Sequence, residues 1–212
     1  MSRFAEAQSY TGGTQDGGVF VAALVASHGI CPQDKILDVG CGMLFAGKFL
    51  MQLVDVGNYH VIEPNAWLYE ASLSQDPQLR AIVDARKPKF SNVSNFDAAE
   101  MIGDDKYDIV FAYSILSHAA HWQLEQFLVN TSKHLAATGV IVVAMRLAEY
   151  DTKAAEWVYP DVSFFRRITV SVAARKAGLF AKERPSYRRL FESYNPAAVH
   201  DWVVFRRVQV AE

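Results

Sequence analysis

The chain has 212 residues, 51% of them hydrophobic and 21% charged, which is the balance of a globular domain with a substantial core. Because 21 Lys and Arg stand against 23 Asp and Glu, the net charge is −2, and we expect no general attraction to nucleic acid or to an anionic membrane. No stretch reaches the roughly 18 apolar residues of a membrane span, and the amino end carries no apolar signal segment. We therefore expect a single domain, residues 1–212, in the cytoplasm.

The cysteines and histidines bear on redox and metal chemistry. Cys31 and Cys41 lie at no spacing typical of a metal site, and a disulfide between them would distort the glycine turn around Cys41. A reducing, cytoplasmic setting fits this pattern best. The six histidines form no recurrent metal-binding pair with another His, Asp or Glu, so we expect no catalytic metal.

The amino-terminal segment is rich in glycine. Residues 9–18 hold four glycines, which is typical of a mobile loop, and an apolar helix is predicted over Val19–His28. We interpret residues 1–18 as a flexible lid that closes over a ligand. A frayed start of the following helix explains the same composition equally well.

The next stretch predicts a buried strand, a tight turn and a helix. Ile36–Val39 is the strand, and Gly40 and Gly42 form a turn in which the backbone can come close to a ligand. Asp38 stands two residues before the first glycine, where an acid can hold an ammonium group or an ordered water. Phe45 occupies the third glycine position of a dinucleotide fingerprint, which argues against a nicotinamide cofactor.

A second predicted strand, Tyr59–Ile62, ends in Glu63 and Pro64. Consecutive parallel strands can meet at the same edge of a sheet, where ligands bind, so we expect Glu63 beside the glycine turn. A carboxylate there can accept hydrogen bonds from both ribose hydroxyls of a nucleoside. Pro64 is expected to start a helix.

The third strand is weaker and spans residues 90–94, followed by Asn95, Phe96 and Asp97. The interpretation of this loop stays open, because Asp97 could equally cap a helix over residues 98–102.

A clear buried strand over Tyr107–Ala112 is followed by Tyr113 and two histidines. His118 and His121 are the histidines placed for a general base, because residues after such a strand sit at the carboxyl edge of the sheet. A histidine at the start of a helix also often only bonds nearby backbone, and both interpretations stay open.

The remaining chain predicts further alternation of helices and strands, over residues 121–135, 140–145, 168–177, 180–184 and 202–208. Residues 146–167 form the longest irregular region and are rich in aromatic side chains. We interpret it as an insertion that covers the substrate, with a small satellite core as the alternative. The alternation as a whole predicts an α/β, doubly wound sheet.

The order of these motifs resembles that of class I S-adenosylmethionine-dependent methyltransferases. Leu37–Gly42 is similar to the first motif of that family, with Leu44 where a third glycine is usual. Glu63–Asn65 is similar to the second motif, and Asp108 with Ser114–His118 to the fourth. The resemblance implies a Rossmann-like, mostly parallel, seven-stranded sheet with helices on both faces and an antiparallel last strand.

The resemblance also implies the cofactor S-adenosyl-L-methionine and in-line transfer of its methyl group to an oxygen, nitrogen or carbon of a small molecule. The residues that it places around the cofactor are Asp38, Gly40, Cys41 and Gly42 at the methionine part, Glu63 and Pro64 at the ribose, Asn95, Phe96 and Asp97 at the adenine, and Tyr113 near the methyl group. His118 or His121 would take a proton from the acceptor where the acceptor needs it.

Two other functions stay open at this point. Leu44 favours a protein that binds the cofactor without catalysis, since its side chain would narrow the space above the turn. A nicotinamide-dependent oxidoreductase is the second, disfavoured by Phe45. The sequence indicates neither the acceptor nor the oligomeric state.

Overall fold

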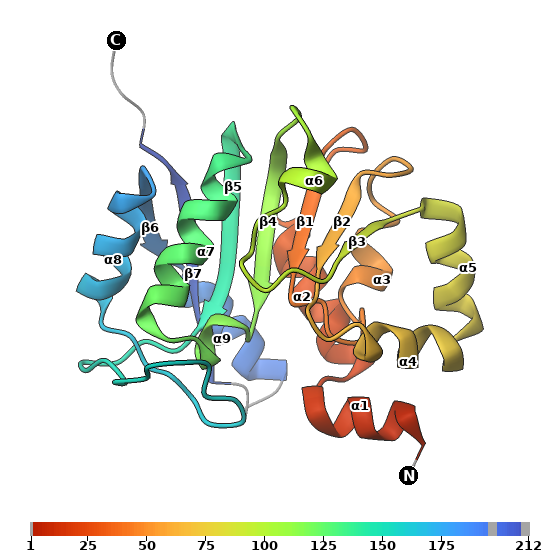
Figure 1. The fold of residues 1–212 in the computed structure, drawn as a ribbon, viewed down its shortest axis with the longest axis horizontal. Helices are drawn as coiled ribbons and strands as arrows, with labels where there is room; N and C mark the ends of the chain where they lie inside the picture. Colours follow the sequence, from red (N-terminus) through yellow and green to blue (C-terminus); the bar gives the residue numbers. More distant parts are fainter. Residues whose placement is uncertain (1, 195–198, 209–212) are drawn as a thin grey trace. The chain divides into compact units, whose positions relative to one another are not determined.

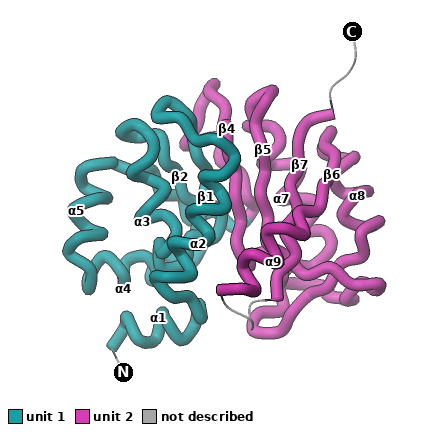
Figure 2. Tube along the Cα trace, turned by 180° about the vertical axis from the view of Figure 1, so that it is seen from behind, with its two compact units in different colours: residues 1–94 teal, residues 95–212 magenta. Residues whose placement is uncertain are grey.

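The computed structural model describes residues 2–194 and 199–208. The chain forms two compact units, unit 1 over Met1–Ser94 and unit 2 over Asn95–Glu212 (Figure 2). Each unit contains several strands with helices packed around them, and each is described by itself.

Unit 1 begins with two helices and continues as alternating strands and helices. Its elements are α1 Arg3–Thr11, α2 Gln15–Ala26, β1 Ile36–Val39, α3 Gly47–Leu50, β2 Tyr59–Ile62, α4 Trp67–Gln75, α5 Pro77–Arg86 and β3 Lys89–Ser91. The three strands are parallel, with Val39 opposite Ile62 and Ile62 opposite Ser91. The carboxyl ends of β1 and β2 therefore lie level at one edge of the sheet, as the sequence analysis expected of consecutive parallel strands.

The glycine-rich segment of unit 1 differs from the sequence prediction. Residues 9–11 belong to α1, and α2 already begins at Gln15, so that Gly17 and Gly18 lie inside a helix. The Thr14 side chain caps α2 by accepting a hydrogen bond from the Gly17 N–H at 3.1 Å, which explains the early start. α4 begins at Trp67, later than the predicted start at Pro64.

Unit 2 contains the remaining four strands and a helix that the sequence analysis missed. Its elements are α6 Ala99–Ile102, β4 Tyr107–Tyr113, the 3₁₀ turn η1 Leu116–His118, α7 His121–Lys133, β5 Leu135–Met145, α8 Arg167–Lys176, β6 Leu179–Glu183, α9 Pro185–Tyr194 and β7 Asp201–Arg207. β4 and β5 are parallel, whereas β7 runs antiparallel to both β5 and β6. α7 and α8 cover one face of these strands and α9, the unpredicted helix, covers the other (Figures 1 and 2).

The strand order is β3-β2-β1-β4-β5-β7-β6, with β7, the last strand in sequence, antiparallel. The predicted α/β, mostly parallel, seven-stranded, Rossmann-like sheet is confirmed. The strands form because short runs of β-branched and aromatic residues are buried on both faces: β1, β2 and most of β4 and β5 are inaccessible to water. Within the part of the chain that the structure describes, no helix is long and apolar enough to cross a membrane.

Candidate functional site

Asp38, near the end of β1, is a buried acid with one strong partner. Its carboxylate accepts a hydrogen bond of 2.6 Å from the hydroxyl of Tyr59 on β2, and only 3% of the residue is exposed. Burial raises the pKa of Asp38 from 3.8 to about 7, although the Tyr59 hydrogen bond opposes this change. The side chain is therefore poised to lose its proton when a cation approaches.

The glycine turn after β1 is hydrogen-bonded to Glu63, which the sequence analysis expected beside the turn at the end of the neighbouring strand. One Glu63 oxygen accepts the N–H of Gly42 and the other accepts the N–H of Asn65, both at 2.9 Å. Gly40 and Gly42 both have positive φ, 77° and 51°, which glycine adopts without steric cost. Cys41 lies between them and is half-buried, and desolvation raises the pKa of its thiol well above its ordinary value. The thiol is therefore no nucleophile here.

Two predicted residues near this turn occupy different surroundings from those expected. Pro64 is exposed in the loop after β2 and caps no helix. Leu44 is fully buried, and a methyl group built on Gly47 would lie 3.0 Å from its Cδ2 atom. The Leu44 side chain thus packs into the core of unit 1 beside α3, which removes the reason to expect it above the turn.

Leu44 also has positive φ, 62°, which costs a residue with a Cβ atom about 1–2 kcal/mol. We therefore expect Leu44→Gly to be more stable than Leu44→Ala by about 1 kcal/mol, the reverse of the usual order at buried positions. Both variants lose the contacts of the Leu44 side chain beyond Cβ and differ from each other only by the Cβ methyl group, so the comparison reports mainly on the backbone conformation. Chemical denaturation of the two variants measures this difference, and a less stable glycine variant would contradict the strain.

The amino-terminal helices pack directly against the glycine turn. A methyl group on Gly42 would lie 3.3 Å from Thr11 Cγ2, at the end of α1. The Tyr10 and Trp67 rings meet edge to face at 5.7 Å, and Ala7 is buried against Met43, the residue after the turn. The described part of this segment, residues 2–18, thus lies beside the glycine turn, mostly in α1 and α2 and not in the loop that the glycines indicated.

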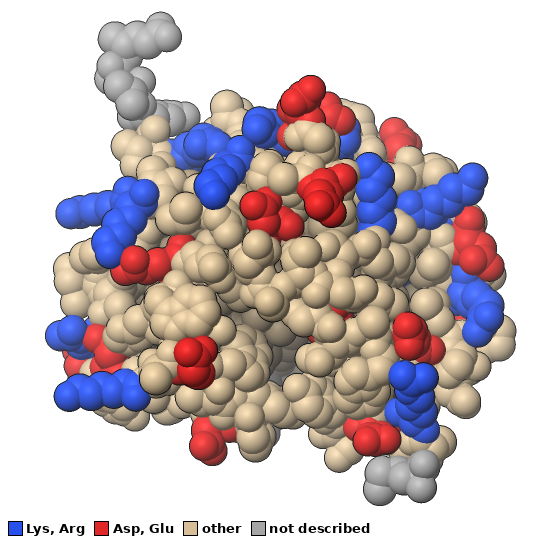
Figure 3. Space-filling model, viewed as in Figure 1, with Lys and Arg blue, Asp and Glu red and all other residues tan. Residues whose placement is uncertain are grey.

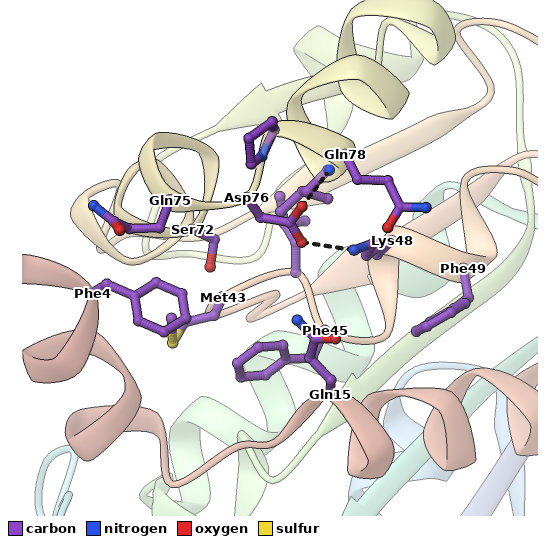
Figure 4. Close-up of a pocket in the computed structure, with 13 residues that line it drawn as sticks. Phe4, Gln15, Met43, Phe45, Lys48, Phe49, Ser72, Gln75, Asp76 and Gln78 are labelled. Atoms are coloured by element: carbon purple, nitrogen blue, oxygen red, sulfur yellow. Dashed lines mark hydrogen bonds and ion pairs between the residues drawn. The ribbon is translucent and has the colours of Figure 1, made fainter.

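A cavity of about 430 Å³ opens in unit 1 beside the residues that follow the glycine turn (Figure 4). Phe4, Met43 and Phe45 lie along it, and a 2.7 Å ion pair joins Lys48 to Asp76 at its margin. Its lining contains neither of the strand-end acids of unit 1. We therefore do not place the cofactor in this cavity.

The loop Asn95–Asp97, in unit 2, is tied to α7 and α6. The Phe96 ring is buried and meets the Phe127 ring edge to face at 5.6 Å. Asp97 accepts the Ala99 N–H at 3.0 Å just before α6, but the N-cap of α6 is Ala98, without a side-chain cap, so the predicted N-cap role of Asp97 is wrong. Asn95 is exposed. Their proposed contacts with an adenine ring remain predictions.

His118 lies in η1, where the insertion of residues 146–167 folds over it. Its Nδ1 atom is 2.7 Å from the Asp161 carbonyl oxygen, and Val158 N–H donates to the His118 carbonyl at 2.9 Å. Since a carbonyl oxygen only accepts, Nδ1 carries the proton, and Nε2 is the basic atom of the neutral ring. Burial lowers the pKa of His118 and keeps the ring neutral. The geometry thus suits proton acceptance.

His121, the first residue of α7, faces other parts of the insertion. Its ring lies 5.3 Å from the Phe165 ring, and its Nε2 atom is 3.6 Å from an Asp151 oxygen, too far for a hydrogen bond. Asp151 already accepts hydrogen bonds from Arg166 and Thr169. His121 is therefore the weaker of the two candidate bases.

The structure adds polar residues that sequence reasoning missed in unit 2. Ser114, directly after β4, has φ of 60°, and its hydroxyl lies 3.0 Å from His200 Nε2. Tyr113 stands between the His200 and Trp202 rings, at 5.1 and 5.9 Å. Arg146 follows β5 directly, so the expectation that site residues follow the carboxyl ends of strands could have identified it. Nothing in the sequence pointed to His200.

In the part of the chain that the structure describes, no group of three or more His, Cys, Asp or Glu side chains could hold a metal ion. The groups described above are carboxylates and backbone N–H groups in unit 1, and aromatic rings and one positioned histidine in unit 2. Such a set can hold a nucleoside with a cationic end, and it can accept a proton.

Comparison with known proteins finds solved structures with a similar fold but no protein with a similar sequence. No family model and no curated protein sequence matches the chain. Solved structures do match, among them a magnesium protoporphyrin IX methyltransferase from Synechocystis PCC 6803 with bound S-adenosylmethionine, 11% identical, with a TM-score of 0.63. That match covers 92% of this chain and 79% of that protein.

Two further solved structures align over a similar extent. An S-adenosylmethionine-dependent methyltransferase from Clostridium acetobutylicum is 10% identical with a TM-score of 0.63, and the match covers 91% of each chain. The CcbJ methyltransferase from Streptomyces caelestis is 15% identical with a TM-score of 0.59, and the match covers 92% of this chain and 89% of that protein. At such identities these likenesses establish the fold.

Proposed function

We propose that the protein is an S-adenosylmethionine-dependent methyltransferase that acts on a small molecule. The observation that carries this proposal is the pair of buried acids Asp38 and Glu63, at the level ends of β1 and β2, with the glycine turn attached to Glu63. The fold shared with solved methyltransferases supports it, including one with the cofactor bound.

The donor and acceptor groups of unit 1 fit this cofactor. An ionised carboxylate has about four acceptor sites, and Glu63 uses two of them on backbone N–H groups, which leaves capacity for two ribose hydroxyls. Asp38 would face the methionine ammonium group, whose charge favours the ionised form of the acid. The backbone of Gly40, Cys41 and Gly42 would lie along the methionine part.

When bound, the cofactor supplies a methyl group activated on a sulfonium. The task of the protein is to align this group with the acceptor, which is worth about 7–11 kcal/mol in favourable cases. We assign His118 as proton acceptor through Nε2, because Nδ1 is committed to the Asp161 carbonyl. Residues 146–167 would cover the acceptor, and residues 1–18 the cofactor side.

The surface favours a small acceptor over a polyanion. On the face seen in Figure 3, Lys and Arg are interspersed with Asp and Glu, and no large area carries one sign. An extended basic area would be expected for a nucleic-acid substrate. Both cysteines are free, which fits a reducing compartment such as the cytoplasm.

The test is calorimetric titration with S-adenosylmethionine, S-adenosylhomocysteine and NAD. Micromolar binding of the first two, and none of NAD, is the expected result. Binding of NAD alone would overturn the proposal in favour of an oxidoreductase. Cofactor binding without methyl transfer to any acceptor in a broad screen would favour the non-catalytic alternative.

Glu63→Ala is expected to weaken cofactor binding by about 1.5–3 kcal/mol, the scale of hydrogen bonds to a charged group, or roughly 10- to 150-fold. The variant loses the ribose contact and also the two backbone bonds that order the turn. Glu70→Ala is the matched control, because this half-exposed acid on α4 only faces Arg3 at 3.5 Å. An unchanged affinity in the Glu63 variant would refute the ribose assignment.

A further inference from the structure

Arg146, directly after β5, forms no ion pair within the described part of the chain, although the charge of Asp201 acts on its guanidinium. Its Nε atom is buried and makes no hydrogen bond. The neighbouring acid, Asp201, is already occupied: one oxygen accepts the Leu147 N–H at 2.8 Å, and the other accepts from Arg188 at 2.7 Å. Burial lowers the pKa of Arg146, which shows that the surroundings disfavour its charge.

Other polar atoms without partners lie on the strands around Arg146. The indole Nε1 of Trp202 and the Nδ1 of His200 are both buried and unpaired in the described structure. The strand registers place Tyr113, Ala144 and Trp202 in one row across β4, β5 and β7, and Arg146 follows two residues after Ala144. The unpaired groups therefore come from adjacent strand ends of unit 2.

The same region is lined by aromatic rings. Tyr113 and Trp202 are stacked with ring centroids 5.9 Å apart, and Phe191 of α9 lies 5.8 Å from Tyr113. His118, the proposed base, has electrostatic contact with both Arg146 and His200. Aromatic rings of this kind pack against planar ligands.

An arginine guanidinium and an indole N–H donate hydrogen bonds and accept none. A buried donor without a partner costs free energy, and a buried cation costs more. A ligand that brings acceptor atoms and negative charge removes both costs, and a carboxylate matches the guanidinium fork best.

We propose that the acceptor of this enzyme is a planar or aromatic small molecule that carries a carboxylate, and that Arg146 binds this carboxylate as an anchor. The role of this ligand as methyl acceptor rests on the proposed methyltransferase function. The binding site itself consists of unit 2 residues alone. The buried Nε1 of Trp202 contributes a further donor, and the half-buried ring of Tyr113 contacts the plane of the ligand.

The experiment titrates the full chain, with and without S-adenosylhomocysteine, with benzoate and indole-3-acetate, each paired with its neutral amide. We expect saturable binding of at least one carboxylate, at least tenfold tighter than that of its amide. Arg146→Met should lose this preference, whereas Arg175→Met, on the exposed side of α8, should keep it. Binding of S-adenosylhomocysteine should be the same in both variants.

The outcomes separate the two proposals. Equal affinity for carboxylate and amide, no saturable binding of either carboxylate, or full retention in Arg146→Met would each overturn the anion site. If Arg146→Met does not fold, the comparison of carboxylate with amide in the wild type decides, together with Arg146→Lys. Lysine keeps the positive charge but lacks the paired N–H donors of the guanidinium, so this variant should bind the carboxylate more weakly. A wild-type protein that binds carboxylates but not the cofactor would overturn the methyltransferase function and leave the anion site standing.

Discussion

Gly18→Ala is expected to destabilise the protein by at least about 3 kcal/mol and to weaken cofactor binding together with stability. A Cβ atom on Gly18 would lie 2.4 Å from both the carbonyl carbon and the oxygen of Phe45. Such distances do not occur between real atoms, and backbone cannot rotate away as a flexible side chain can. α2 must therefore move away from the residues that follow the glycine turn.

The neighbouring glycine provides the control for this prediction. A Cβ atom on Gly17, in the same first turn of α2, meets only the Thr14 hydroxyl at 3.1 Å, and alanine favours helix by up to about 1 kcal/mol over glycine. Urea denaturation of both variants measures the contrast. Equal stability of Gly17→Ala and Gly18→Ala would show that α2 does not pack on Phe45.

The ionisation of Asp38 is expected to produce a large dependence of stability and of cofactor binding on pH. Because burial raises the folded-state pKa from 3.8 to about 7, the stabilising contribution is fully present below pH 4 and is lost as the pH rises through 7. Its full size is on the order of 4 kcal/mol, at about 1.4 kcal/mol per pKa unit. Cofactor affinity should change in the opposite direction, rising with pH as the carboxylate becomes charged.

Asp38→Asn separates this contribution from all other titrating groups. The amide keeps the shape and can still accept the Tyr59 hydroxyl hydrogen bond, but it cannot ionise. The difference in unfolding free energy between wild type and variant, measured from pH 4 to 8, should fall as the pH rises. The variant should also lose most of the pH dependence of cofactor binding between pH 6 and 8. A pH-independent difference would contradict the raised pKa.

The strand-end residues were the part of the candidate site that the sequence could predict. Asp38 and Glu63 follow short apolar runs, and parallel strands with level ends place such residues at one edge whatever the rest of the chain does. The partners of these acids were not predictable. Tyr59 and the N–H of Gly42 reach them only through the pairing of β1 with β2 and the path of the turn.

The loop after β3 and the glycine-rich segment show what the sequence could not predict. The resemblance predicted Phe96 next to the adenine, and the structure adds that its ring packs on Phe127 of α7, a contact that the sequence did not indicate. The glycines of residues 9–18 suggested mobility, yet Gly18 is required for close packing against Phe45. The sequence shows which residue types are present, whereas the packing partners of Phe96 and Gly18 depend on which element of the fold lies next to them.

The count of seven strands was implied by the family resemblance. By itself the sequence determined the order and type of most elements, an α/β doubly wound sheet and the acids at the ends of β1 and β2. These features depend on local patterns: buried apolar runs make strands, and glycines permit positive φ in the turn. The tertiary structure alone decided that Asp38 is desolvated, that His118 presents Nε2, and that Arg146, His200 and Trp202 have buried, unpaired nitrogen atoms near Tyr113. Solvation, proton positions and pairing depend on residues far apart in the chain, and only packing brings these together.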